Sequence, residues 1–275
     1  MADVDVQPAA TGDPAQFPDP AEFPDPAELH RRRTVTEILI VLGLSLGASA
    51  VYAVINLVGK LTEGRPLAQQ KATLNPSLSP RPYLDLAYQL ADIAFTVVPV
   101  ALALFLLADR IPDAARALGF DLRLPGRDLA AGAALAALIG LPGLVLYFAG
   151  RALGVTADVV AAALTPHWWA VPVLVLQAVK NAVVEEVVVV GYLLTRLEHL
   201  GWPTWARLGT SAVLRGSYHL YQGFGPFLGN AVMGLLFGEW FRRRGRVMAL
   251  VIAHTLLDVV SFVGYQLFAG ALGLR

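Results

Sequence analysis

The sequence contains no cysteine. Its absence excludes disulfide bonds, thiol nucleophiles, iron–sulfur clusters and zinc sites built from cysteine. Any chemistry of this chain must therefore come from carboxylate, imidazole, hydroxyl or amine groups.

Charged residues are also scarce. They make up 15% of the 275 residues, against roughly 25% in an ordinary soluble domain, whereas apolar residues make up 56%. Apolar runs of about 20 residues recur along the chain, and each is long enough to cross the roughly 30 Å hydrocarbon layer of a bilayer as a helix. The composition argues against a water-soluble globule and predicts an integral membrane protein, an all-α polytopic transmembrane helical bundle.

Lysine and arginine are missing from the first thirty residues, which hold seven acidic residues and six prolines. The repeated PAQFPD and PAEFPD segments have few branched apolar side chains and cannot bury enough surface to fold. Residues 1–33 are therefore predicted to be a disordered, acidic, proline-rich tail, and residues 34–275 to be the transmembrane domain.

About seven spanning helices are predicted, within a range of six to eight. The predicted spans are Val35 to Gly59, Leu84 to Ala108, Asp128 to Gly150, Val171 to Leu194, Trp202 to Tyr221, Phe224 to Phe241 and Arg246 to Phe268. With seven spans, lysine and arginine are more frequent on the side of the N-terminus, which predicts a cytoplasmic N-terminus. The basic segment Arg242 to Arg246 is interpreted as a loop that meets anionic headgroups, not as a nucleic-acid site. The Ala-, Val-, Leu- and Arg-rich composition suggests a bacterial plasma membrane. The oligomeric state is left open.

A pair of carboxylates lies deep in the fourth predicted span. Charged groups at membrane depth cost about 2.5 to 3.5 kcal/mol each on insertion scales, so each is a candidate functional group. Gln177, Asn181 and Glu185 are spaced by four residues and share one helix face, which must lie against protein or water. Adjacent Glu185 and Glu186 need partners to stay charged, and a buried carboxylate of this kind is suited to act as a general base.

Two of the five histidines fall within predicted spans. His254 is followed by Asp258 one helical turn later, so that the carboxylate can orient the imidazole or share a metal with it. His219 lies four residues after Arg215. A bundle that brings these faces to the glutamate pair would form an activated-water hydrolase site, or a site for a divalent metal such as Zn²⁺ with His219, His254 and Asp258 as ligands.

These motifs resemble those of the CPBP (CAAX protease and bacteriocin-processing) intramembrane protease family, which includes the type II CAAX prenyl endopeptidases. The resemblance covers a protease-like core at about residues 167–268, through EEVVVVGYL, the segment ending in His219, and HTLLD. It implies that Glu185, with Glu186 beside it, is the catalytic glutamate, and that His219 helps it to activate water. It also implies that His254 and Asp258 support the oxyanion, unless a metal-bound water is the nucleophile.

The chain departs from the family motifs at two positions. Val190 stands where the first motif has arginine, and Arg215 stands where the second motif has phenylalanine. Glu186 thus lacks the cationic partner that the family pattern supplies within its own helix. We expect Arg215 to pair with Glu186 from the next span, with Lys180 as the rival partner.

The predicted function is that of an intramembrane endopeptidase that hydrolyses a peptide bond of a membrane-associated or lipid-linked protein or peptide. Glu185, Glu186, His219, His254 and Asp258 are the predicted catalytic residues. Arg215 and Asn181 are expected to support them, and the cofactor is either a divalent metal or none. The alternative is a non-catalytic membrane protein, either a degenerate family member that acts as a scaffold or a proton-coupled transporter.

Overall fold

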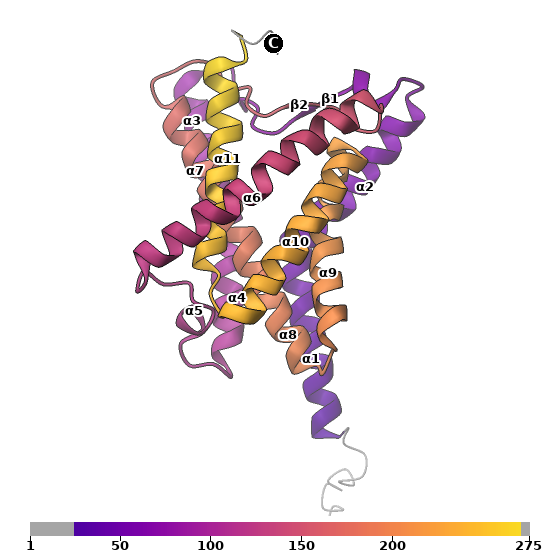
Figure 1. Ribbon diagram of the computed structural model, residues 1–275. Helices are drawn as coiled ribbons and strands as arrows, with labels where there is room; N and C mark the ends of the chain where they lie inside the picture. Colours follow the sequence, from indigo (N-terminus) through magenta and orange to yellow (C-terminus); the bar gives the residue numbers. More distant parts are fainter. Residues whose placement is uncertain (1–24, 271–275) are drawn as a thin grey trace, which may run out of the picture.

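The computed structural model describes residues 25–270, which form a bundle of helices with almost no sheet (Figure 1). The helices are α1 (Pro26–Gly43), α2 (Leu46–Thr62), α3 (Pro82–Thr96), α4 (Val98–Ala108), α5 (Ala114–Ala117), α6 (Pro125–Ala152), α7 (Ala170–Val184), the π-helical turn η3 (Glu185–Tyr192), α8 (Leu193–His199), α9 (Thr204–Ser217), α10 (Phe224–Arg244) and α11 (Met248–Phe268), with short 3₁₀ turns η2 (Leu67–Gln69) and η4 (Leu220–Gln222). The predicted all-α helical bundle is confirmed.

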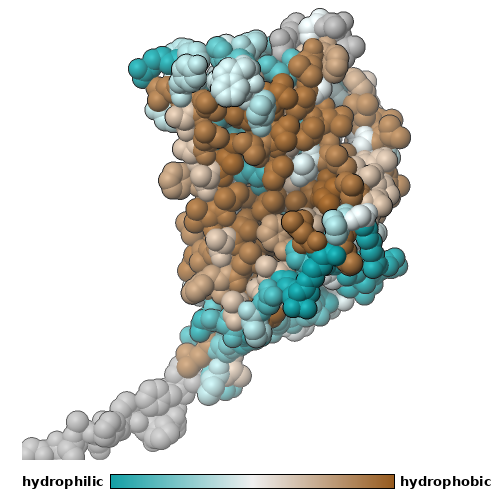
Figure 2. Space-filling model, turned by 90° about the vertical axis from the view of Figure 1, so that its left-hand side faces the viewer, coloured by the Kyte–Doolittle hydropathy of each residue, from teal (hydrophilic) through white to brown (hydrophobic). Residues whose placement is uncertain are grey.

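Three stretches of helix within residues 25–270 are long and apolar enough to cross a membrane: Pro82–Ala108, Pro125–Ala152 and Met248–Phe268. The pair α1 and α2 would be a fourth if it forms one span. Figure 2 shows the apolar surface as a broad band between two polar ends. The protein is thus an integral membrane protein by its apolar helices, while the predicted number of seven spans stays a prediction.

The first predicted span differs from the structure in its start and its shape. The helix begins already at Pro26, inside the predicted tail, because Asp25 accepts a hydrogen bond from the Ala27 amide and a proline opens the first turn. The rest of the predicted tail, residues 1–24, lies outside the described residues. The chain then bends by 55° between α1 and α2. At this bend Gly47 approaches the Leu42 carbonyl so closely that a Cβ atom would lie 2.7 Å from its oxygen.

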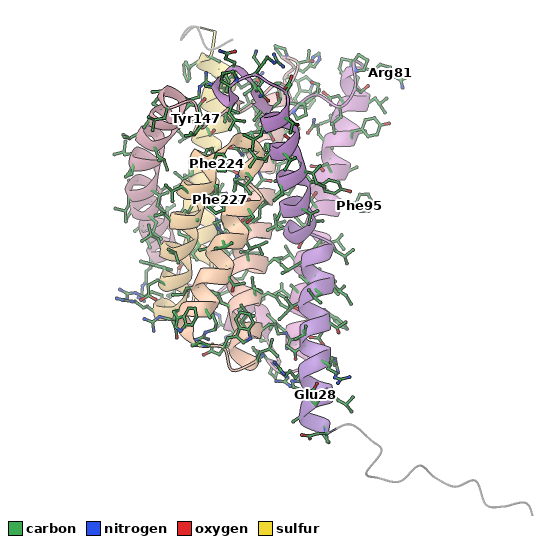
Figure 3. The ribbon with its side chains drawn as sticks, turned by 90° about the vertical axis from the view of Figure 1, so that its right-hand side faces the viewer. Glu28, Arg81, Phe95, Tyr147, Phe224 and Phe227 are labelled. Atoms are coloured by element: carbon green, nitrogen blue, oxygen red, sulfur yellow. The ribbon has the colours of Figure 1, made fainter. Side chains whose placement is uncertain are left out.

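Two loops close one end of the bundle. β1 (Lys71–Thr73) pairs in parallel with β2 (Asp158–Val160), and Thr156 forms an antiparallel bridge with Gly223. Figure 3 shows Arg81 at this end and Glu28 at the opposite end, where α1 begins. The two short strands were not predicted, and they fix the loops before α3 and α7 to each other.

The opposite end is held by an ion-pair cluster around Arg246. Its guanidinium donates to Asp128 at 2.6 Å and to Asp121 at 3.0 Å, and the next amide, of Val247, donates to the Leu118 carbonyl. These contacts attach the loop before α6 to the start of α11. The position of α11 is therefore fixed just before the helix that carries His254.

Candidate active site

Glu185 and Glu186 open the π-helical turn η3 in the middle of the long helical stretch formed by α7, η3 and α8. This turn is enclosed by the core, since Val187, Val188, Val189 and Val190 are all inaccessible to solvent. π turns are rare inside helices and occur frequently at functional sites. The Val189 carbonyl, at the centre of the turn, accepts a hydrogen bond from the Ser211 hydroxyl of α9 at 2.8 Å.

Glu186 is held by two partners from other helices. Arg215 of α9 donates through Nη2 to both carboxylate oxygens at 2.8 Å, and His254 of α11 lies with Nδ1 2.7 Å from Oε1. Glu186 and Arg215 are both 0% exposed, and the guanidinium lies over the Phe237 ring. The expected pairing of Arg215 with Glu186 is confirmed, and the cation missing at Val190 is replaced from a neighbouring helix.

Lys180, the rival partner, lies elsewhere. Its Nζ donates to Asp92 of α3 at 3.0 Å, and Gln177 donates to the same carboxylate and to Gln89. The polar face predicted for α7 is confirmed, because its members contact α3 and α11. Gln177 of this face contacts α3, whereas Asn181 contacts Asp258 of α11 beside the glutamate site.

Glu185 is less enclosed than its neighbour. It is 7% exposed, and its Oε2 accepts a hydrogen bond from the Tyr218 hydroxyl at 2.7 Å. Arg215 Nη1 lies 3.4 Å from the same oxygen. None of the hydrogen bonds found among residues 25–270 uses Oε1 of Glu185. This carboxylate is therefore anchored by one oxygen and has a second oxygen available.

Tyr218 was missed by the sequence analysis. It lies directly after α9, and its ring is 4.9 Å from the ring of His219. The only sequence signal that could have singled it out is its position next to His219. A hydroxyl that meets a carboxylate 33 positions away has no signature in spacing.

His219 lies between α9 and η4, directly after Tyr218, whose hydroxyl bonds Glu185. Its Nδ1 is 3.2 Å from Nε2 of Gln222. If that amide donates, the imidazole must carry its proton on Nε2. Nε2 is buried and has no hydrogen-bond partner in the part of the chain that the structure describes. His219 thus has a buried polar atom without a partner, next to the tyrosine that anchors Glu185.

His254 and Asp258 lie on one face of α11 as predicted, but they are not hydrogen-bonded. Their Nε2 and Oδ2 atoms are 3.8 Å apart, while Asp258 accepts from Asn181 at 3.2 Å. His254 is instead bonded to Glu186. Of the third motif, only the His254 imidazole is hydrogen-bonded to a glutamate, Glu186. The Asp258 carboxylate is held by its hydrogen bond from Asn181.

The donor atoms of Glu185, Glu186 and His254 lie within 4.8 Å of one another, and such a group could hold a metal ion. It shares only His254 with the predicted ligand set of His219, His254 and Asp258. The cation that this group already contacts is Arg215, which lies 2.8 Å from both oxygens of Glu186. A divalent ion would compete with this buried guanidinium for the oxygens of Glu186 and would need a deprotonated ring nitrogen on His254, so the present contacts count against a metal.

Comparison with known proteins finds a family that this part of the chain resembles. A family model described as Type II CAAX prenyl endopeptidase Rce1-like matches residues 167–260, a segment that includes both glutamates, His219, His254 and Asp258. Searches of curated proteins and of solved structures gave no match. The match covers about a third of the chain, and over this segment the predicted resemblance to the CPBP family, which includes the type II CAAX prenyl endopeptidases, is confirmed.

Proposed function

We propose that the protein is an intramembrane endopeptidase in which Glu185 activates water without a metal. The observation that carries this proposal is the different environment of the two glutamates. Glu186 has both oxygens engaged by Arg215 and His254, whereas Glu185 is anchored by Tyr218 and Arg215 through Oε2 alone and keeps Oε1 available. A general base needs such an available oxygen within reach of water.

The reaction follows from these positions. Glu185 takes a proton from water, and the hydroxide oxygen bonds to the carbonyl carbon of the scissile peptide while the carbonyl electron pair moves to oxygen. When the tetrahedral intermediate collapses, the C–N bond breaks, and Glu185 returns the proton to the leaving nitrogen. General acid–base catalysis of this kind contributes typically about 10²- to 10⁴-fold to the rate.

Four further side chains serve this step. The N–H at Nε2 of His219 stabilises the developing oxyanion, as hydrogen-bond donors in dry sites do. Tyr218 fixes the rotamer of Glu185 by donating to Oε2. Arg215 and His254 hold the Glu186 carboxylate in place, and the resulting cluster sets the electrostatic environment of the base.

The substrate class comes from the family and from the setting of the site. The matched family acts on CAAX prenyl proteins by its description, and the glutamates lie within a bundle with an apolar surface. We infer that the substrate is a membrane-associated or lipid-linked protein or peptide. We also infer a bacterial plasma membrane location with the N-terminus in the cytoplasm.

The proposal is tested by comparing membrane proteomes of cells that produce the intact protein, Glu185→Gln or a matched control, Glu63→Gln, at an exposed loop position. New protein termini should appear with the intact protein and with the control, and should be absent with Glu185→Gln at equal abundance. If the same termini appear with Glu185→Gln, the proposed mechanism is wrong. If none appears with any form, the scaffold or transporter reading takes its place.

A further inference from the structure

A second polar site lies at the end of the bundle where α1 begins, away from the glutamates. It is a cavity of about 190 Å³ at the point where α1, α4 and α8 come together. Its lining residues are His30, Arg33, Thr34, Glu37, Asp109, Arg110 and Arg196. The catalytic proposal uses none of these groups.

The charges of this cavity do not balance. Glu37 accepts from Arg33 at 2.8 Å and forms an ion pair with Arg196 at 2.8 Å, and Asp109 is bound by Arg33 as well. Three guanidinium groups therefore face two carboxylates, and one positive charge lacks a counterion. The ion pair of Glu37 with Arg196 ties α1 to α8.

Arg110 is the cation without a carboxylate. Its Nη2 lies 2.7 Å from Nδ1 of His30, so the imidazole accepts a hydrogen bond but cannot neutralise the charge. The other nitrogen of His30, Nε2, lies 3.4 Å from the Thr34 hydroxyl. Within the described chain, Arg110 forms no ion pair.

Arg196 supplies a second unused donor. The residue is 2% exposed, and its Nη2 donates to the Leu106 carbonyl at 2.6 Å. Its Nε is buried and has no hydrogen-bond partner among residues 25–270. Arg196 thus keeps its positive charge at the wall of the cavity, held in place by Glu37 and the Leu106 carbonyl.

We propose that this cavity binds a phosphate group, either that of an anionic lipid headgroup or free phosphate. A phosphate group carries negative charge on several acceptor oxygens, which matches the surplus positive charge of the cavity and the free N–H groups of Arg110. Arginine is the side chain best suited to such oxyanions because its planar fork donates several parallel bonds. The cavity lies at the end of the bundle where α1 begins, and basic pockets at the ends of membrane helices can bind anionic headgroups. This inference goes beyond the proposed protease function and does not depend on it.

The test measures binding by the purified full chain. Inorganic phosphate is titrated into the detergent-solubilised protein by calorimetry, and thermal stability is compared between nanodiscs of phosphatidylcholine alone and nanodiscs that also contain phosphatidylglycerol. Arg110→Gln removes the unpaired cation at an exposed position. Arg127→Gln, also exposed and outside the cavity, is the matched loss of charge.

We expect Arg110→Gln to raise the dissociation constant for phosphate about tenfold, or to reduce the thermal stabilisation by phosphatidylglycerol if the headgroup is the ligand. Arg127→Gln should leave both responses unchanged. Saturable binding of inorganic phosphate would identify free phosphate as the ligand, whereas stabilisation by phosphatidylglycerol alone would identify the headgroup. The proposal is overturned if the intact protein responds to neither probe. It is also overturned if Arg110→Gln responds as strongly as the intact protein.

Discussion

Replacing Arg215 by methionine should destabilise the protein strongly while keeping the length of the side chain. Arg215 is 0% exposed and bonds both oxygens of Glu186, which is also 0% exposed. Methionine retains the contact with the Phe237 ring but leaves the Glu186 carboxylate buried with His254 as its remaining partner.

The magnitude follows from the cost of breaking a buried ion pair. Removing one partner costs about 3 to 5 kcal/mol, because the other charge stays buried without compensation. Removing both charges is far less costly, and replacing a buried pair by apolar or neutral groups is often close to neutral. The double variant Glu186→Gln with Arg215→Met should therefore recover most of the stability that Arg215→Met loses.

The assay measures the free energy of unfolding of both variants and of the intact protein in the same detergent, together with their expression levels. Arg207→Met is the matched control, because Arg207 pairs with the exposed Glu198 at 2.8 Å and exposed pairs contribute about 0 to 1 kcal/mol. The reasoning is refuted if Arg215→Met is as stable as Arg207→Met. It is also refuted if the double variant is no more stable than the single one.

Three further predictions concern the metal, the packing and the loops. Metal chelators should leave cleavage unchanged, and the purified protein should hold less than one equivalent of zinc by elemental analysis; loss of activity that zinc restores would show a metal enzyme. Gly150→Ala should destabilise by about 1 to 3 kcal/mol in thermal unfolding, because a Cβ atom would lie 2.2 Å from the Thr156 hydroxyl oxygen, whereas Gly143→Ala meets nothing within 4 Å and should be neutral. Hydrogen bonding to Arg246 lowers the pKa of Asp121 from its ordinary 3.8. The ionised carboxylate therefore stabilises the fold above pH 3.8, and this contribution is lost as the pH falls through the lowered pKa. The melting temperature of Asp121→Asn should fall less over that pH range than the melting temperature of the intact protein.

Much of the site could be predicted from sequence because its chemistry depends on helical spacing. Buried carboxylates at membrane depth require partners, and this requirement pointed to Arg215 once Val190 was seen to lack a charge. The face shared by Asn181 and Glu185 follows from the four-residue period of a helix. The structure confirms these contacts because they follow from local geometry and charge balance.

Other features depend on contacts that no spacing encodes. The hydrogen bond from Tyr218 to Glu185 and that from Ser211 to Val189 join residues of different helices. The π turn at Glu185 and the bend before Gly47 arise from packing of the surrounding helices, and they leave no periodic signal. The same is true of the cavity beside Arg196, whose members come from three helices far apart in the chain.

The central claim is that Glu185 acts while Glu186 supports the fold. It is tested most directly by measuring cleavage and thermal stability together for Glu185→Gln and Glu186→Gln, using the substrate termini that the proteome comparison identifies. The account predicts that Glu185→Gln keeps the melting temperature of the intact protein and loses cleavage, whereas Glu186→Gln lowers the melting temperature because Arg215 is left buried without its charged partner. Cleavage retained by Glu185→Gln, or an unchanged melting temperature in Glu186→Gln, would contradict it.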